Sequence, residues 1–259
     1  MSDFQFIKVE KKHRHVIITL NRGRANPLNL EMLDELHICF NELLDDDNIY
    51  GVILTGKEDF FSVGVDVIEV FDYDPDMTEK FWSSLTQLMI KMAKFPKPLI
   101  AAISGHAPAG GCVLAIPADY RIMADGNYTI GLNEIPLGIA VPENFFHMYA
   151  FWLGHRRAYQ YLLEGKLLTV DEALKYHLID QKCASDELLF MAEQKMAHYL
   201  ALIPDVFKLS KINFRKELIR SLEIDIGRTI SAFLKQWWSD ETRETIAKLI
   251  NSIKNKSND

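Results

Sequence analysis

The stretch from Pro96 to Gly138 constrains the fold more than any other part of the chain. It opens with Leu99–Ile103, a short apolar run that is typical of a fully buried strand. A segment of small residues ending in Gly110 and Gly111 follows, and after it comes an apolar run suited to the first turns of a buried helix. The sequence therefore predicts a strand, a glycine turn and a helix start in direct succession.

The predicted helix start can hold a negatively charged oxygen. The first backbone N–H groups of a helix lack intrahelical partners and lie at the positive end of the helix dipole. Gly110 and Gly111 carry no side chain, so a ligand oxygen could approach the backbone closely. Further on, Glu134 stands among apolar neighbours, which indicates a proton-transfer role. Taken singly, the glycine pair is better explained by close packing, and Glu134 by a loop carboxylate bound to a nearby N–H.

Strands and helices alternate along the chain before this stretch. Phe4–Glu10 and His15–Leu20 predict a hairpin, and Gly51–Gly56 predicts a buried strand. Apolar residues at helical spacing predict helices over Leu30–Leu44 and Pro75–Phe95. This alternation favours an α/β fold with a mainly parallel sheet.

Helical patterns dominate after Gly138. Long apolar stripes predict helices over Asp186–Leu202, Pro204–Leu222 and Leu222–Ile253. We therefore expect a core over residues 1–195 and a C-terminal helical region over residues 196–259.

Composition narrows the classes of function. The net charge of -7 and the pI near 5.6 argue against a nucleic-acid partner. The three cysteines have no paired spacing, and neither they nor the eight histidines show the spacing of metal ligands. No apolar run reaches the length of a membrane span, and the first residues lack the features of a signal or transit peptide. We expect a cytoplasmic protein with no bound metal and no membrane partner.

Five short motifs follow one another along the chain, namely Asn26–Asn29, Phe61–Asp66, Pro108–Cys112, Ala118–Ile122 and Leu132–Ile139. In this order and spacing they resemble the motifs of the crotonase (enoyl-CoA hydratase/isomerase) superfamily, and most of all those of its mitochondrial-type Δ3,Δ2-enoyl-CoA isomerases. The resemblance covers nearly the whole chain. It implies a spiral core of ββα units, a C-terminal helical region that closes the acyl site and makes subunit contacts, and a homotrimer or a pair of trimers.

The resemblance also implies site residues. The substrate would be an acyl-CoA thioester, so coenzyme A enters as part of the substrate and no separate cofactor is expected. The backbone N–H groups of Val65 and Gly110 would hold the thioester oxygen, and Glu134 would transfer the proton. The further residues implied in substrate binding are Arg24, Ala25, Ser62, Val63, Gly64, Asp66, Gly111, Val113 and Asn133.

A single carboxylate favours isomerisation over hydration. The resemblance implies that hydratases use a second glutamate at the position of Val113, where this chain has an aliphatic residue. An isomerase needs only one base, because Glu134 can take a proton from one carbon and return it to another. A hydratase or thioester decarboxylase, or a non-catalytic acyl-CoA-binding or RNA-binding homologue, remains the alternative, although the acidic charge counts against RNA.

Other polar residues have weaker claims. His106 is expected to be a loop histidine at the boundary of an element, and Glu143 and His147 could supply a second proton donor but also suit the opening of a helix. Arg22 and Arg24 could meet the phosphates of coenzyme A, or could be ordinary exposed loop charges.

Overall fold

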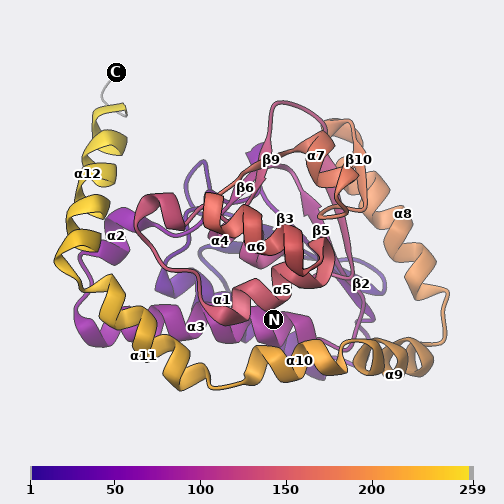
Figure 1. Ribbon diagram of the computed structural model, residues 1–259. Coiled ribbons are helices and arrows are strands. Elements are labelled where there is room, and N and C mark those ends of the chain that lie inside the picture. Colours follow the sequence, from indigo (N-terminus) through magenta and orange to yellow (C-terminus); the bar gives the residue numbers. More distant parts are fainter. Residues whose placement is uncertain (1, 257–259) are drawn as a thin grey trace.

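The computed structural model of the chain describes residues 2–256 and contains two β-sheets surrounded by helices (Figure 1). The larger sheet has the strand order β1-β2-β3-β5-β7-β10, and the smaller has the order β4-β6-β8-β9. In the larger sheet β1 and β2 form the expected antiparallel hairpin, and the other neighbours run parallel, which confirms the α/β fold. The strands are β1 Ile7–Lys11, β2 His15–Leu20, β3 Gly51–Thr55, β4 Asp59–Phe60, β5 Leu99–Ile103, β6 Gly105–Pro108, β7 Tyr120–Ala124, β8 Thr129–Gly131, β9 Leu168–Thr169 and β10 Gln181–Cys183.

The chain passes from the larger sheet into the smaller one three times in the same way. β3 leads to β4, β5 to β6 and β7 to β8. Because β4, β6 and β8 are parallel neighbours, the segments that follow them leave from the same edge of the smaller sheet. Helices return the chain to the larger sheet after β4 and β6, whereas after β8 the chain first passes through β9 of the smaller sheet. The helices up to residue 175 are α1 Leu30–Asp45, α2 Val67–Phe71, α3 Pro75–Lys94, α4 Gly110–Ala115, α5 Glu143–Leu153, α6 His155–Glu164 and α7 Val170–Lys175, and the 3-10 turns are η1 Ile135–Leu137 and η2 Ser185–Glu187.

None of the four short strands of the smaller sheet was predicted from the sequence. His106 was expected in a loop, but it lies in β6, where it pairs with Phe60 of β4. Strands of two to four residues are too short to show an apolar alternation, so their sequences resemble loops.

The C-terminal helices run around the outside of the core, from α8 to α12 (Figure 1). Two of the three long helices expected here are each broken in two, so that prediction was wrong. One break falls at Arg215, whose guanidinium turns inward to the carbonyls of Ala93, Pro117 and Ala118. The other separates α11 from α12. These helices are α8 Leu188–Leu200, α9 Pro204–Phe214, α10 Lys216–Glu223, α11 Ile226–Trp237 and α12 Asp240–Lys256.

A buried ionic cluster ties the C-terminal helices to the larger sheet. Asp119, just before β7, accepts from the Nζ of Lys211 at 2.7 Å and pairs with Arg215 at 3.1 Å. It also accepts the N–H of Leu99 in β5 at 2.8 Å. The side chains of Lys211 and Arg215 are only 5% exposed, and burial lowers the pKa of Lys211 to about 8. One carboxylate therefore holds α9, the start of α10 and two strands together.

No helix within residues 2–256 is both long and apolar enough to cross a lipid bilayer.

Replacing Asp119 should destabilise the protein strongly. Asp119→Asn keeps the shape of the side chain but leaves two buried cations without a counter-charge, which costs about 3–5 kcal/mol in comparable buried pairs. Urea unfolding would measure the change. The control is Asp125→Asn, because Asp125 pairs with Lys182 while half exposed and should change stability by about 1 kcal/mol or less. Equal effects of the two substitutions would contradict this role for the cluster.

Candidate active site

The backbone around Val65 is held by Leu28. The N–H of Leu28 donates to the carbonyl of Gly64 at 2.8 Å, and the N–H of Asp66 donates to the carbonyl of Leu28 at 2.9 Å. The N–H of Val65 takes no part in this pairing. It lies beside the start of α4, since a Cβ built on Gly110 would stand 3.3 Å from the Val65 nitrogen.

Gly110 is the first residue of α4, so its N–H has no partner in the helix. Ala109 before it has a φ of 47° and a ψ of -122°, a region that residues with a Cβ rarely occupy. A hydrogen bond from the Ala109 N–H to the carbonyl of Gly131, at 2.8 Å, holds this turn in place. Within the described residues neither Val65 nor Gly110 uses its N–H in a backbone hydrogen bond. The two neighbouring donors are therefore available to a ligand oxygen.

Gly64 and Gly111 allow these two segments to come together. Gly64 has a φ of 88°, and a Cβ on it would lie 2.9 Å from the Gly110 nitrogen. A Cβ on Gly111 would lie 2.2 Å from the carbonyl oxygen of Ser62. The hydroxyl of Ser62 donates to the carbonyl of Asn26 at 2.7 Å and accepts the Gly64 N–H at 3.1 Å. The close packing of these residues fixes the distance between the N–H groups of Val65 and Gly110.

Glu134 follows β8 and is 7% exposed. Its Oε2 is buried and has no hydrogen-bond partner among the described residues. Burial raises the pKa of Glu134 to about 7, although a hydrogen bond from its own backbone N–H acts in the opposite direction. A carboxyl in this setting is partly ionised at neutral pH and can both accept and release a proton.

Glu134 and the two backbone donors line one cavity of about 220 Å³. Glu134 is the sole ionisable residue in the described lining of this cavity. A carbonyl oxygen bound between the two N–H groups would therefore share an apolar space with a single acid. The lining residues are Val63, Val65, Val67, Trp82, Leu85, Pro108, Ala109, Gly110, Asn133, Glu134, Leu137, Ile139, Phe145, Leu249 and Ile253.

The loop after Glu134 is anchored to the C-terminal helices. The side chain of Gln236 in α11 donates to the carbonyl of Gly138 at 2.8 Å and accepts the N–H of Ala140 at 3.1 Å. The hydroxyl of Thr242 in α12 also donates to the Gly138 carbonyl, at 3.2 Å. The position of the loop that carries Glu134 therefore depends on helices more than ninety residues away in sequence.

The structure brings together most of the residues expected at the site. Val63, Val65, Gly110, Asn133 and Glu134 line the cavity directly. Outside the described lining, Gly111 packs closely against Ser62, and Gly64 packs closely against Gly110. The carbonyl of Ala25 accepts the N–H of Val63 at 3.0 Å.

Some of the expected residues have other positions. The carboxylate of Asp66 caps α2 and pairs with Arg22 at 2.7 Å, so neither side chain is free for a substrate. Glu69 also binds Arg22. Arg24 is 82% exposed and weakly paired with a neighbouring carboxylate, and Val113 is fully buried outside the described lining of the cavity.

The far wall of the cavity was not identified from the sequence. Trp82 and Leu85 come from α3, Leu249 and Ile253 from α12, and Phe145 from α5. The apolar stripes of these helices predicted burial, but a helical stripe carries no information about what it packs against.

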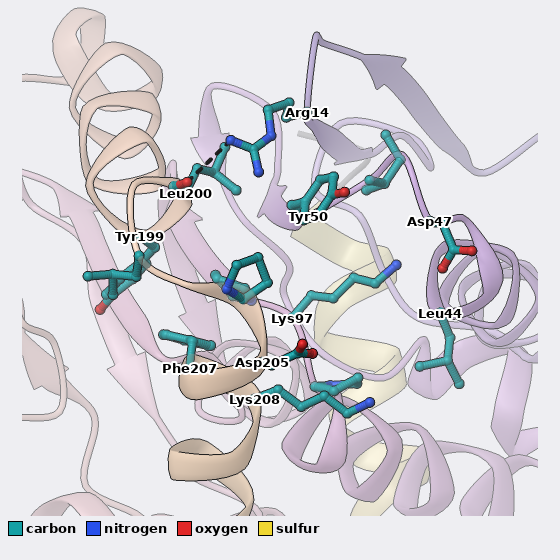
Figure 2. Close-up of a pocket in the computed structure, with 15 residues that line it drawn as sticks. Arg14, Leu44, Asp47, Tyr50, Lys97, Tyr199, Leu200, Asp205, Phe207 and Lys208 are labelled. Atoms are coloured by element: carbon teal, nitrogen blue, oxygen red, sulfur yellow. Dashed lines mark hydrogen bonds between the residues drawn. The ribbon is translucent and has the colours of Figure 1, made fainter.

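A second cavity, of about 350 Å³, lies where strands of the larger sheet begin (Figure 2). Its lining includes Arg14, Tyr50 and Pro98, which immediately precede β2, β3 and β5. Two of the cations there are engaged: Arg14 donates to the carbonyl of Leu200 at 3.3 Å, and Lys97 donates to two carbonyls at the end of α1. Among the described residues, its lining shares no member with the lining of the cavity around Glu134.

Among the described residues, no group of three or more His, Cys, Asp or Glu side chains is arranged to hold a metal ion.

Comparisons with known proteins agree with this geometry. Residues 10–255 match the family described as Enoyl-CoA hydratase/isomerase. The chain is 35% identical to the mitochondrial enoyl-CoA delta isomerase 1 of Mus musculus, over 93% of this chain and 84% of that protein. It is 27% identical to a short-chain-enoyl-CoA hydratase of Clostridium acetobutylicum, over 95% of each. The crystal structure of human mitochondrial delta3-delta2-enoyl-CoA isomerase superposes with a TM-score of 0.93 at 29% identity, covering 97% of this chain and 99% of that one. This likeness confirms the expected fold and its C-terminal helical region.

Substituting Gly64 should damage catalysis through the backbone. In Gly64→Ala the new Cβ would press on the Gly110 nitrogen and separate the two donors, so kcat should fall about 10²–10³-fold, as when an oxyanion donor is lost. The control is Gly154→Ala, which also has a positive φ but no atom within 4 Å of its Cβ. Steady-state kinetics of both variants, with unfolding curves, would test this. A Gly64→Ala enzyme with the kcat of the control would rule the prediction out.

Proposed function

We propose, from the premise that the chain belongs to the enoyl-CoA hydratase/isomerase family, that it is an isomerase that moves the double bond of a 3-enoyl-CoA to the 2 position. The observation that carries this proposal is the single ionisable residue, Glu134, in the described lining of a cavity that also presents two unpaired backbone donors. One base and one pair of donors are what a double-bond shift requires.

The first step removes a proton from the carbon next to the thioester carbonyl. Ionised Glu134 takes this proton, and the electron pair moves into the carbonyl and leaves negative charge on its oxygen. The N–H groups of Val65 and Gly110 stabilise that oxygen, each by roughly 3 kcal/mol in comparable sites. Without them the carbanion would be too unstable for a carboxylate base.

The second step returns the same proton at a different carbon. Removal of the first proton conjugates the negative charge with the double bond, so the γ-carbon becomes nucleophilic. Neutral Glu134 then protonates the γ-carbon, and the double bond forms between the α- and β-carbons. The enzyme and the overall proton count are unchanged. A pKa near 7 suits both halves of this cycle, because the carboxyl is neither a very weak base nor a very weak acid.

Hydration is the second activity that the family admits, and one relative is named as a hydratase. Addition of water needs a group that activates the water and another that handles the second proton. In this chain Val113 stands where the resemblance implies a second glutamate, and no other carboxylate reaches the described lining of the cavity. This arrangement supports isomerisation over hydration.

The quaternary structure and location are also proposals. Ile203, Val206 and Leu209, in and beside α9, are each more than half exposed, which supports a contact with another subunit and thus a homotrimer or a pair of trimers.

The cytoplasmic location expected from the sequence stays a prediction, and relatives from Mus musculus and Rattus norvegicus are named as mitochondrial.

The isomerase proposal predicts conjugation without hydration. Purified protein should convert 3-hexenoyl-CoA to 2-hexenoyl-CoA and should add little water to 2-hexenoyl-CoA. Glu134→Gln, which keeps the shape but cannot accept a proton, should lower kcat at least about 10²-fold. The control is Glu143→Gln, because the Glu143 side chain is 64% exposed and should be dispensable. Rapid hydration, or an active Glu134→Gln enzyme, would contradict the proposal.

The pH dependence follows from the same group. Only ionised Glu134 can accept the first proton, so kcat/KM should fall tenfold per pH unit below about pH 7. A rate that stays constant from pH 5 to 8 would argue against Glu134 as the base.

The stability of the folded state should change with pH in the direction opposite to the activity, because of the same residue, Glu134. The folded pKa is raised above the unfolded value, so the folded state binds more protons and loses stability as the pH rises towards 7. Glu134→Gln has no charge to bury, and at pH 8 it should be more stable than the wild type by about 1–3 kcal/mol in urea unfolding. At pH 4 the difference should vanish. If Glu134→Gln were less stable than the wild type at pH 8, burial of the Glu134 charge would not be destabilising.

A further inference from the structure

The cavity beside Glu134 is small for an acyl-CoA site. Its volume is about 220 Å³, below the roughly 300–1,000 Å³ of pockets that enclose drug-sized ligands. At roughly 30 Å³ for a group the size of water, it has room for about seven such groups. A thioester carbonyl and about five further carbons would fill it.

The wall contributed by α3 is an aromatic side chain that cannot easily move. Trp82 is 3% exposed and its ring centroid lies 4.4 Å from Phe233, 5.4 Å from Trp237 and 5.3 Å from Phe81. These neighbours are themselves buried. Close-packed interiors resist rotation of a side chain of this size, so a ligand cannot simply displace the indole.

The remaining wall residues are aliphatic or aromatic. Leu85 of α3 is fully buried, and Leu249 comes from α12. The part of the cavity away from Glu134 and Asn133 therefore offers no charged partner within the described lining. The indole Nε1 of Trp82 is buried without a hydrogen-bond partner among the described residues, and apart from this one N–H the wall suits a plain hydrocarbon chain.

We propose that Trp82 closes the acyl end of the cavity and restricts the enzyme to short acyl groups of about six carbons. This inference rests on the proposed function, because it names the acyl group that the same site accepts. Trp82 determines specificity and does not take part in proton transfer.

The wild-type chain-length profile tests the inference first. Each methylene that the cavity buries should raise kcat/KM about fourfold, and the gain should stop once the chain reaches Trp82. The assay uses 3-butenoyl-, 3-hexenoyl-, 3-octenoyl- and 3-dodecenoyl-CoA. We expect the highest kcat/KM near six carbons and at least a tenfold lower value at twelve. Equal values at six and twelve carbons would overturn the inference.

Substitution of Trp82 tests the residue itself. Trp82→Leu removes most of the ring, so the ratio of kcat/KM for 3-dodecenoyl-CoA to that for 3-hexenoyl-CoA should rise at least tenfold over the wild-type ratio. Trp237→Leu is the matched control, because Trp237 is fully buried in the same aromatic cluster but lies outside the described lining of the cavity. It should leave the ratio within about twofold. Equal changes in both variants would show a general loosening and would contradict a specific role for Trp82.

Two further measurements test the role of Trp82 if Trp82→Leu does not fold or if the wild type shows no activity. If Trp82→Leu does not fold, Trp82→Phe makes the smaller change, and the ratio should still rise measurably above that of the wild type. Calorimetric binding of hexanoyl-CoA and dodecanoyl-CoA does not depend on catalysis. A wild type that binds hexanoyl-CoA at least tenfold more tightly but isomerises no enoyl-CoA would refute the proposed function and support the cavity limit. A wild type that isomerises all chain lengths equally would support the function and refute the limit.

Discussion

The burial of one carboxylate without a counter-charge is the constraint on which the rest of the site depends. The carboxylates that meet buried cations are paired: Asp119 with Lys211 and Arg215, and Asp180 with Arg121. Glu134 differs, because its Oε2 has no partner and burial raises its pKa to about 7. An unpaired buried acid lowers the stability of the folded state, so its presence needs a functional reason. The two unpaired backbone donors in the same cavity supply one.

A repeated passage of the chain from the larger sheet to the smaller one brings the groups of the site together. Each passage from the larger sheet to the smaller one ends in a segment that contributes one group, namely Val65 after β4, Gly110 after β6 and Glu134 after β8. Parallel pairing of these short strands brings the three segments together. The unusual φ of Ala109 stores strain where the second donor is presented, and the bonds to Gly131 and Val113 hold it. The C-terminal helices complete the arrangement by fixing the loop after Glu134.

The sequence carried much of this information, because the groups that make the chemistry lie in short contiguous motifs. Leu99–Ile103 was predicted with its observed bounds, and Gly110 begins a helix as expected. The partners with which individual side chains form hydrogen bonds and ion pairs could not be predicted from the sequence. Asp66 was expected at the substrate, but it is used by the cap of α2 and by Arg22. The break at Arg215 depends on carbonyls far away in the chain, and so does the role of Trp82 in the cavity wall.

We propose that a single carboxyl in an apolar cavity carries the proton from one carbon to the other. Isomerisation of 3-hexenoyl-CoA in D₂O, with the deuterium at the γ-carbon of the product measured by mass spectrometry after a single turnover, tests it most directly. Most product molecules should keep the original proton, because Glu134 is shielded from solvent. Complete deuterium incorporation at the γ-carbon in the first turnover would contradict it.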